Sequence, residues 1–482
     1  MRSRLFYGLA LTAVGLVLGG CINLGPDYQR PDLRVEPPPS YEYAPADTRA
    51  LVVEDRWWEV FGDGELNRYV AEALQNNWDI KRAAARVLET RARYGRVRAD
   101  RLPTVGVSGL KDRRLVSGGA GNDGVIVDTY ELTAPASYEV DLWSKLKKSS
   151  QAAWEEILQE EEARRTLAQA VVAETIALYL DMEAVERRLQ IAEQSIQAFR
   201  QSLQFVETRY RRGLTSVLDV RQARRVLAQA ETIIPQLEQE LGIIQQQLAG
   251  LLGRYPATQA PRKQPEDYYK QLAPVPPGLP SDLLWQRPDL RAAESNLKAL
   301  NERVGVAKAN RLPTITLTGR YGWSSADLNT LLRTENVVWN LTAGIVQPLF
   351  DAGKLRAGQR EAEARYQQGV AQYVQTALDA FAEVERALLT RASQLDLRAR
   401  ELRFLEEARA TQRVAESRYI RGLVIYLDVL NAQITRFQAE DSLVLVDLAI
   451  YRNRVALHRA LGGGWGEPQP IEVKEDGIFW NF

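Results

Sequence analysis

The sequence has few of the residues that build metal centres and disulfide frameworks. Its 482 residues include one cysteine and one histidine, and 62 basic side chains balance 62 acidic ones. The scarcity of cysteine and histidine excludes zinc fingers, iron–sulfur clusters, disulfide scaffolds and most histidine-based catalysis. A formal net charge of zero argues against a nucleic-acid binder, which needs a basic surface to displace counterions. We therefore expect no metal site, no cofactor and no nucleic-acid partner.

Long hydrophobic runs are also missing beyond the N-terminus. No uncharged apolar stretch there approaches the about 18–20 residues that a membrane-spanning helix needs, which excludes a helical membrane protein. Walker, dinucleotide-binding and Ser/His/Asp patterns are missing too. We expect His458 to be a solvated helix residue and the acidic run at 160–162 to be a solvated helix face. The sequence therefore predicts no enzyme.

A secretory signal with a lipidation site begins the chain. Arg2 and Arg4 form a positive start, residues 5–18 are uncharged and apolar, and two glycines precede Cys21. This order resembles a bacterial lipobox, whose cysteine would carry diacylglycerol and an N-acyl chain as the mature N-terminus. An ordinary signal peptide with an incidental cysteine is the alternative. Ile22, in place of an aspartate, favours the outer membrane of a Gram-negative bacterium, where such an anchor holds a protein at the surface.

Two copies of one pattern divide the chain. Four matches recur at a spacing of 209–210 residues, including Arg-Leu-Pro-Thr from 101 and 311 and Tyr-x-Arg-Gly-Leu from 210 and 419. Leu-Asp-Val from 218 and 427 and Lys-Leu from 145 and 354 keep the same offset. We predict the following segments: a signal peptide at 1–20, an extended lipid-anchored segment at 21–55, a first repeat at 56–253, a proline-rich linker at 254–280, a second repeat at 281–465 and a tail at 466–482.

Each repeat has the pattern of a helix, two strands, a very long helix, a tight turn and another long helix. Strong helix formers dominate residues 146–209 and 355–419, and apolar residues from 366 to 387 alternate in steps of four and three, as in a coiled coil. About 65 residues make a rod of roughly 100 Å, which is too long for the core of a compact domain. Each rod ends at a glycine, and a helix follows over 217–252 or 427–461. Pro235 interrupts the first of these and should kink it or mark a register change.

Four shorter segments alternate with the period of a strand. Residues 314–323 and 337–346 are apolar or aromatic at every second position, and 103–111 and 125–139 are weaker equivalents. This pattern is typical of a transmembrane β-barrel, with a soluble amphipathic hairpin as the alternative. Four strands cannot close a barrel, and hydrocarbon does not tolerate free edges. Three chains would give twelve strands. The glycine-rich stretch at 117–124 is interpreted as a surface loop, because no phosphate-binding lysine motif follows it.

Short motifs throughout the chain carry a family resemblance. They are Gly25-Pro26-Asp27-Tyr28, Trp57-Trp58, Arg287-Pro288-Asp289 and the run from Ala460 to Trp465. With these motifs the chain resembles the outer membrane efflux family of TolC-type channel-tunnels, in its lipoprotein branch of multidrug efflux channels. The resemblance implies an α+β membrane channel: a homotrimer with four strands per chain in a shared 12-stranded barrel, and coiled-coil helices that form a periplasmic α-barrel tunnel. It also implies coupling to a periplasmic adaptor and an inner-membrane pump.

The same resemblance assigns residues to the periplasmic end of the tunnel. Asp428 matches the first position of an aspartate ring, and Asn431 stands where some relatives carry a second acid. Asp219 and Tyr419 match residues that link neighbouring coils in the closed state. Val424 replaces the arginine of that network, and Arg421 is near enough in sequence to substitute for it. Capping of a helix start is the structural alternative for both aspartates.

The turns after the two rods are the expected contact sites for the adaptor. Their residues are Gly213, Leu214, Thr215, Gly422 and Leu423. The predicted function is therefore export of drugs or other small toxic compounds through the outer membrane. Two alternatives stay open: a channel for type I protein secretion, and a lipid-anchored periplasmic coiled-coil protein of structural or adaptor type. The lipobox and the Gly25–Pro31 start favour small-molecule efflux, and the paired strands argue against the coiled-coil protein.

Overall fold

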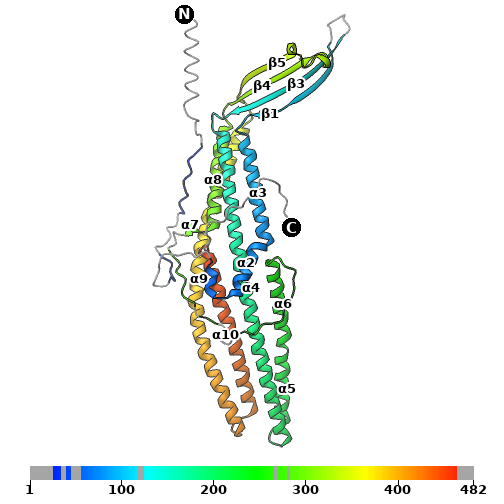
Figure 1. Ribbon diagram of the computed structural model, residues 1–482. Helices are drawn as coiled ribbons and strands as arrows, with labels where there is room; N and C mark the ends of the chain where they lie inside the picture. Colours follow the sequence, from blue (N-terminus) through cyan, green and yellow to red (C-terminus); the bar gives the residue numbers. More distant parts are fainter. Residues whose placement is uncertain are drawn as a thin grey trace. The chain divides into compact units, whose positions relative to one another are not determined.

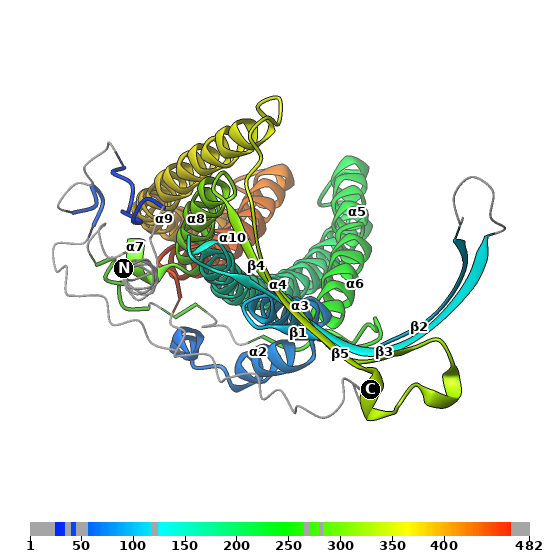
Figure 2. The ribbon, with the colours of Figure 1, turned by 90° about the horizontal axis from the view of Figure 1, so that it is seen from above.

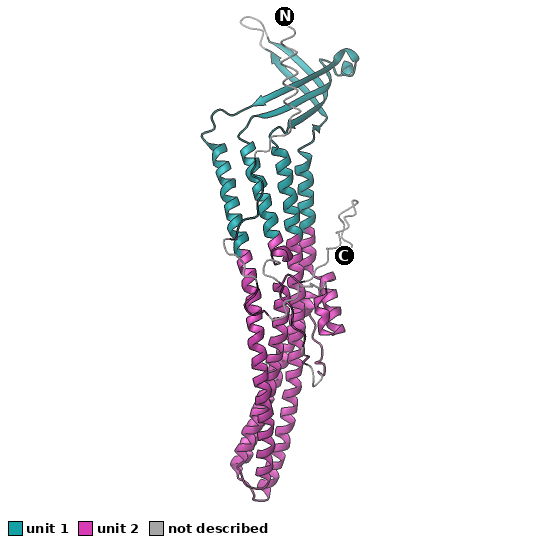
Figure 3. Ribbon diagram, turned by 90° about the vertical axis from the view of Figure 1, so that its left-hand side faces the viewer, with its two compact units in different colours: residues 1–32, 86–161, 292–375 teal, residues 33–85, 162–291, 376–482 magenta. Residues whose placement is uncertain are grey.

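A computed structural model describes residues 25–33, 40–44, 56–116, 124–264, 269–270, 272–278 and 283–463. Cys21 with the signal peptide, most of the 117–124 loop, parts of the proline-rich linker and the tail lie outside the described residues. The chain divides into two compact units. Unit 1 comprises residues 1–32, 86–161 and 292–375, and unit 2 comprises 33–85, 162–291 and 376–482 (Figure 3). None of the described helices is long and apolar enough to span a membrane.

The two halves of the sequence repeat one order of elements (Figure 1). The first half contains η1 (Trp57–Phe61), α2 (Gly64–Asn76), α3 (Trp78–Ala99), β1 (Thr104–Val105), β2 (Ser108–Val116), β3 (Val125–Val140), α4 (Lys145–Arg211), α5 (Val217–Glu231) and α6 (Ile233–Leu251). The second half contains α7 (Leu283–Gln286), α8 (Pro288–Ala309), β4 (Thr314–Ser325), η3 (Leu328–Thr330), η4 (Thr334–Asn336), β5 (Val337–Val346), α9 (Lys354–Ile420) and α10 (Tyr426–Ala460). This is the internal duplication that the sequence predicts.

The helix after the first turn is interrupted, whereas its counterpart in the second half is continuous. Instead of one helix over 217–252, α5 ends at Glu231 and α6 begins at Ile233, with Thr232 between them. Pro235 has no N–H for the carbonyl of Glu231, four residues earlier, and its ring crowds that carbonyl. The interruption predicted from Pro235 is confirmed.

The strands form one antiparallel sheet of unit 1. β1 and β2 pair with β3 in the same register, with Thr104 opposite Ser137 and Ser108 opposite Thr133. They therefore form one strand that is interrupted opposite Pro135, which has no N–H to donate. β4 follows β3 and β5 follows β4, so the five strands occupy four positions in the sheet, with β1 and β2 sharing one of them. This agrees with the four predicted strands. The first strand reaches Val116, beyond the predicted end at 111. Figure 2 shows how β2 and β3 curve.

One face of the sheet is apolar across three strands. Ile315 lies opposite Ile345, and Tyr321 lies opposite Trp339. Leu132 of β3 lies opposite Trp323. Opposed residues of neighbouring strands share a face, so these pairs place the apolar positions on one side. The other face carries small and polar side chains, including Thr316, Thr318 and Arg320 of β4.

The long helices bury the predicted coiled-coil seam from Tyr373 onward, whereas its first two residues, Tyr366 and Val370, are half-buried. Tyr373, Ala377, Ala380, Val384 and Ala387 of α9 are at most 6% exposed. In unit 2 the largest apolar cluster combines residues of α2, α4, α6 and α10. The middle of α4 is therefore covered by other helices, which removes a large apolar surface from water.

Two predictions about solvated side chains are wrong. His458 stacks on Trp57 with ring centroids 4.5 Å apart, and burial lowers its pKa to about 3. Glu162 is buried and forms two ion pairs through its Oε1 atom, with Arg165 Nη1 at 2.8 Å and with Arg291 Nη2 at 2.6 Å. The sequence of one helix does not show which aromatic or charged side chains of other helices will lie beside it. Only the packed structure could show the contacts of His458 with Trp57 and of Glu162 with Arg291.

Candidate functional site

Two turns with the same backbone geometry end the long helices, and both lie at the same end of unit 2 (Figure 1). The N–H of Leu214 donates to the carbonyl of Arg209 at 2.9 Å, and the N–H of Gly213 donates to the carbonyl of Tyr210 at 2.8 Å. This is a Schellman motif, which satisfies the last carbonyls of a helix. The turn at Gly422 repeats both bonds. Gly213 and Gly422 have φ of +71° and +74°, which side chains rarely adopt.

Apolar side chains are exposed at both turns. Leu214 is 60% exposed and Leu423 is 68% exposed. Four further exposed apolar residues flank them: Val217, Leu218, Ile420 and Ile425. Exposed apolar side chains that cluster at one end of a helical unit are typical of a protein interaction site.

Asp219 forms a capping box at the start of α5. The hydroxyl of Ser216 accepts the N–H of Asp219 at 3.3 Å, and the carboxylate of Asp219 accepts the N–H of Ser216 at 3.3 Å. The hydroxyl of Thr215 also donates to this carboxylate. The local alternative for Asp219 is therefore observed, because its carboxylate stabilises free N–H and O–H groups of its own turn.

Asp428 is at the matching position of α10, but its surroundings differ. The residue that caps α10 is Ile425, which has no side-chain hydrogen bond to offer. The side chains of Asp428 and Asn431 are exposed and lie three residues apart, within one turn of the same helix. Within the described residues, the Asp428 carboxylate accepts no hydrogen bond and forms no ion pair. It is thus available for a contact outside the chain.

Tyr419 is buried in an aromatic cluster where α4, α9 and α10 meet. Its ring packs against the rings of Phe205 and Tyr426, with centroid separations of 6.2 Å and 5.5 Å. The guanidinium of Arg209 lies 5.0 Å from the centre of the Tyr419 ring. The hydroxyl of Tyr426 lies 2.9 Å from that of Ser202. Burial raises the pKa of Tyr426, and the nearby Tyr419 and Asp219 add to this effect.

The arginine beside Tyr419 is Arg209 rather than Arg421. Arg421 is exposed, and no hydrogen bond or ion pair joins it to Tyr419 or Asp219 in the described part of the chain. Val424 is half-buried against the apolar cluster formed by α4, α5, α10 and Tyr419 of α9. Sequence reasoning missed Arg209 and Tyr426. Both residues lie close in sequence to the Tyr-x-Arg-Gly-Leu turns, and this was the available signal that they contribute to the site.

Residues 69–254 and 279–463 each match the family described as outer membrane efflux protein. The chain belongs to the outer membrane efflux protein family. It therefore has the fold of an outer-membrane channel with long helices and antiparallel strands, and it acts as an efflux channel in the outer membrane of a Gram-negative bacterium.

Named relatives cover nearly the whole chain. The cation efflux system protein CusC of Escherichia coli O6:H1 is 34% identical over 453 residues, which cover 94% of this chain and 97% of CusC. A crystal structure of CusC has a TM-score of 0.83 at 32% identity and covers 92% of this chain and 100% of that chain. The probable outer membrane lipoprotein SilC of Salmonella typhimurium is 33% identical, and the match covers 94% of this chain and 97% of SilC. The solvent efflux pump outer membrane protein SrpC of Pseudomonas putida is 34% identical, and the match covers 96% of this chain and 99% of SrpC.

Proposed function

We propose that three copies of this chain close one twelve-stranded barrel in the outer membrane and continue it into the periplasm as a tunnel of coiled-coil helices. The two edges of the sheet carry this proposal. In the described part of the chain, β5 and the strand formed by β1 and β2 are each paired on one side only. Hydrocarbon supplies no hydrogen bonds to a free edge. Three sheets joined edge to edge would satisfy every strand.

The apolar face of the sheet supports contact with lipid. From Ile315 to Trp323 it spans eight residue steps, which correspond to about 26 Å at about 3.3 Å per residue. This is close to the apolar band of about 25 Å in outer-membrane barrels. Trp339 and Leu341 on this face are 74% and 77% exposed, so the chain itself does not cover them.

The free carboxylate of Asp428 supports a role at the periplasmic constriction. Three copies around an axis would bring three carboxylates together, with Asn431 in the next layer. Such a ring concentrates negative potential in a narrow mouth and favours cations. Asp219, Tyr419 and Arg421 are proposed to restrain the coils around this mouth in the closed state through contacts with a neighbouring copy, because within the described chain Asp219 caps its own turn and Arg421 is exposed.

The exposed turns support docking of a periplasmic adaptor that connects the channel with an inner-membrane pump. Leu214 and Leu423 supply apolar contact area, while Gly213, Gly422 and Thr215 hold the backbone of the turns. The proposed cargo is a drug or another small toxic compound. Relatives of equal identity are named for cations and for solvents, so sequence identity does not select the compound.

Cys21 is the proposed lipidation site, and the lipid chains would anchor each copy in the outer membrane. This proposal rests on the lipobox and on the lipoprotein name of SilC. The segment boundaries predicted from the sequence remain part of the same proposal, with residues 21–55 as the anchored segment and 254–280 as the linker between the repeats.

Membrane assembly tests the proposed function directly. We expect the mature chain to migrate as a heat-resistant trimer and to conduct ions in planar bilayers. Leu341→Asp places a charge on the apolar face and should abolish both properties, whereas Thr342→Asp on the polar face should keep them. A monomer without conductance would contradict the proposal and favour a periplasmic coiled-coil protein. Deletion of the gene, followed by drug-susceptibility and secretome assays, separates small-molecule efflux from protein secretion.

A further inference from the structure

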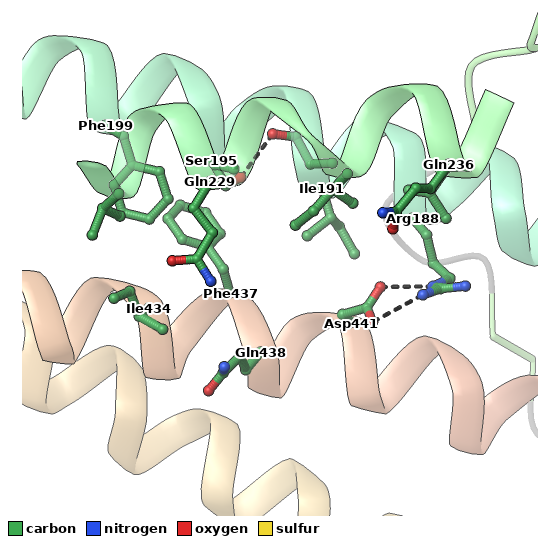
Figure 4. Close-up of a pocket in the computed structure, with 15 residues that line it drawn as sticks. Arg188, Ile191, Ser195, Phe199, Gln229, Gln236, Ile434, Phe437, Gln438 and Asp441 are labelled. Atoms are coloured by element: carbon green, nitrogen blue, oxygen red, sulfur yellow. Dashed lines mark hydrogen bonds and ion pairs between the residues drawn. The ribbon is translucent and has the colours of Figure 1, made fainter. Parts of the chain in front are cut away.

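Two adjoining cavities form a groove in unit 2. The first has a volume of about 360 Å³ and is lined by α4, α5, α6 and α10 (Figure 4). The second has a volume of about 510 Å³ and is lined by α4, α6 and α10. Arg188 and Gln236 line both cavities. Each volume lies within the range of about 300–1,000 Å³ that is usual for small-molecule sites.

The wall of the first cavity contains the interruption between α5 and α6. Ala230 precedes Thr232, Ile233 follows it, and both Ala230 and Ile233 line the cavity. α10 has no matching interruption. The hollow therefore lies at the level where a broken helix and a continuous helix line the same space.

Aromatic and aliphatic side chains form the interior of the first cavity. Phe199 of α4 and Phe437 of α10 meet edge to face, with ring centroids 5.4 Å apart. Ile191, Leu237 and Ile434 line the same space. Gln229, Gln236 and Gln438 are exposed at its rim (Figure 4). This surface suits the ring system of an amphiphilic molecule, with amide groups around it.

The charged side chains of the groove have an excess of acid. Arg188 donates to Asp441 at 2.7 Å and 3.3 Å, and it also lies 3.5 Å from Glu240. One guanidinium therefore serves two carboxylates. The other two charged residues, Asp181 and Arg452, form an ion pair with each other. The groove thus has three acidic and two basic side chains, and it complements a single positive charge.

The face of α10 that lines the groove also carries a residue proposed for the constriction. Gln438 follows Asn431 by seven residues, which is one heptad, so both side chains lie on the same face of a coiled-coil helix. Leu445 of the second cavity follows after another heptad. If Asn431 faces the tunnel axis, the groove opens toward the same space.

We propose that this groove binds an amphiphilic organic cation, with its ring system against Phe199 and Phe437 and its protonated amine beside Glu240 and Asp441. The assignment rests on the proposed function, because it places the groove in the wall of the tunnel. It names a class of exported compound: ring-containing molecules with one positive charge. Another copy of the chain would be the competing occupant of the groove.

Rhodamine 6G, a cationic ring dye, tests the site on the purified trimer in amphipol. Fluorescence anisotropy should show saturable binding. Ala230→Phe fills the first cavity and should weaken binding at least tenfold. Ala228→Phe adds the same ring two residues away, at an exposed position outside the cavity. The dissociation constant of this variant for rhodamine 6G should stay within twofold of the wild-type value. The absence of saturable binding, or equal binding by both variants, would overturn the proposal.

A charge variant keeps the test decisive if the larger side chain prevents assembly. Glu240→Gln should weaken rhodamine 6G binding at least threefold and leave binding of the neutral dye N-phenyl-1-naphthylamine unchanged. Glu231→Gln removes an exposed acid that pairs with Arg200 outside the groove and should have no effect on either dye. Unchanged binding to Glu240→Gln would contradict the cation assignment. A trimer that conducts in bilayers without binding the dye contradicts only this inference, whereas a folded trimer without conductance contradicts the proposed function itself.

Discussion

The turns of the two halves have the same backbone but different side-chain chemistry. Both use a glycine with positive φ and the same pair of hydrogen bonds. At the start of the next helix, the first half has Ser216 and a capping box with Asp219. The second half has Ile425, which cannot cap. Val424 and Ile425 thus replace the two hydroxyl residues, Thr215 and Ser216, that bond to Asp219. This difference separates an acid that stabilises its own turn from an acid that is left exposed.

The tyrosines before the two glycines differ in the same way. Tyr210 is 46% exposed, whereas Tyr419 is 7% exposed and packs inside the aromatic cluster. Duplication copied the turn, and packing then gave the copies different roles. The first turn is stabilised by local hydrogen bonds, and the second is held by apolar contacts with α4.

The tyrosine pair should show the largest difference in stability. Tyr419→Ala removes a buried ring and should lower the stability of the coiled-coil end by about 3–5 kcal/mol. Tyr210→Ala removes an exposed ring and should change it by about 0.5 kcal/mol or less. Hydrogen exchange of the amides in the first turns of α5 and α10 measures both effects. Equal losses would show that the two turns are packed alike.

The acid pair should differ in its effect on ion flow. Asp428→Asn should weaken block by a trivalent cation at least tenfold in planar bilayers, because three carboxylates would leave the constriction. Asp219→Asn should change the cation concentration needed for block by no more than about twofold, since the Asp219 carboxylate already serves the capping box. Loss of block by Asp219→Asn, with none by Asp428→Asn, would reverse the assignment of the two acids.

The glycine pair should respond equally. Gly213→Ala and Gly422→Ala each place a Cβ at positive φ, where the cost is about 1–2 kcal/mol. Apart from the adjoining residues of the chain, no atom of the described residues lies within 4 Å of either added Cβ, so within one chain the backbone conformation alone sets the loss. Thermal unfolding of each trimer should show two similar decreases in midpoint. A much larger decrease at one turn would indicate that a neighbouring chain packs against it.

The capping pair should show the smallest change. Ser216→Ala should cost about 1 kcal/mol, the usual value for a lost cap. Ile425→Ser introduces the missing hydroxyl and should recruit Asp428 into a capping box, so it should also weaken cation block in the direction of Asp428→Asn. Amide exchange and conductance measured on the same variant would check the link. Stabilisation of α10 with unchanged block would separate the capping of Asp428 from its role in the channel.

Much of the fold could be predicted because its signals are local or periodic. The break at Pro235 follows from one missing N–H, and the seam from Tyr373 to Ala387 follows from heptad spacing. The candidate site was only partly accessible. The sequence indicated Asp219 and Asp428 at matching positions of the two repeats, but Arg209 and Tyr426 enter the site from helices whose alignment the sequence does not specify.

By itself, the sequence determined the duplication, which is visible as matched motifs 209–210 residues apart. It also determined the glycine turns, the alternation of the strands and the break between α5 and α6, because each of these depends on neighbours within a few residues. Tertiary structure alone decided which side chains meet between helices. It stacked His458 on Trp57, paired Glu162 with Arg291, and brought Arg188 to both Asp441 and Glu240. These contacts depend on the axial shift and rotation of packed helices, and a helical repeat allows several such alignments until the cores are formed.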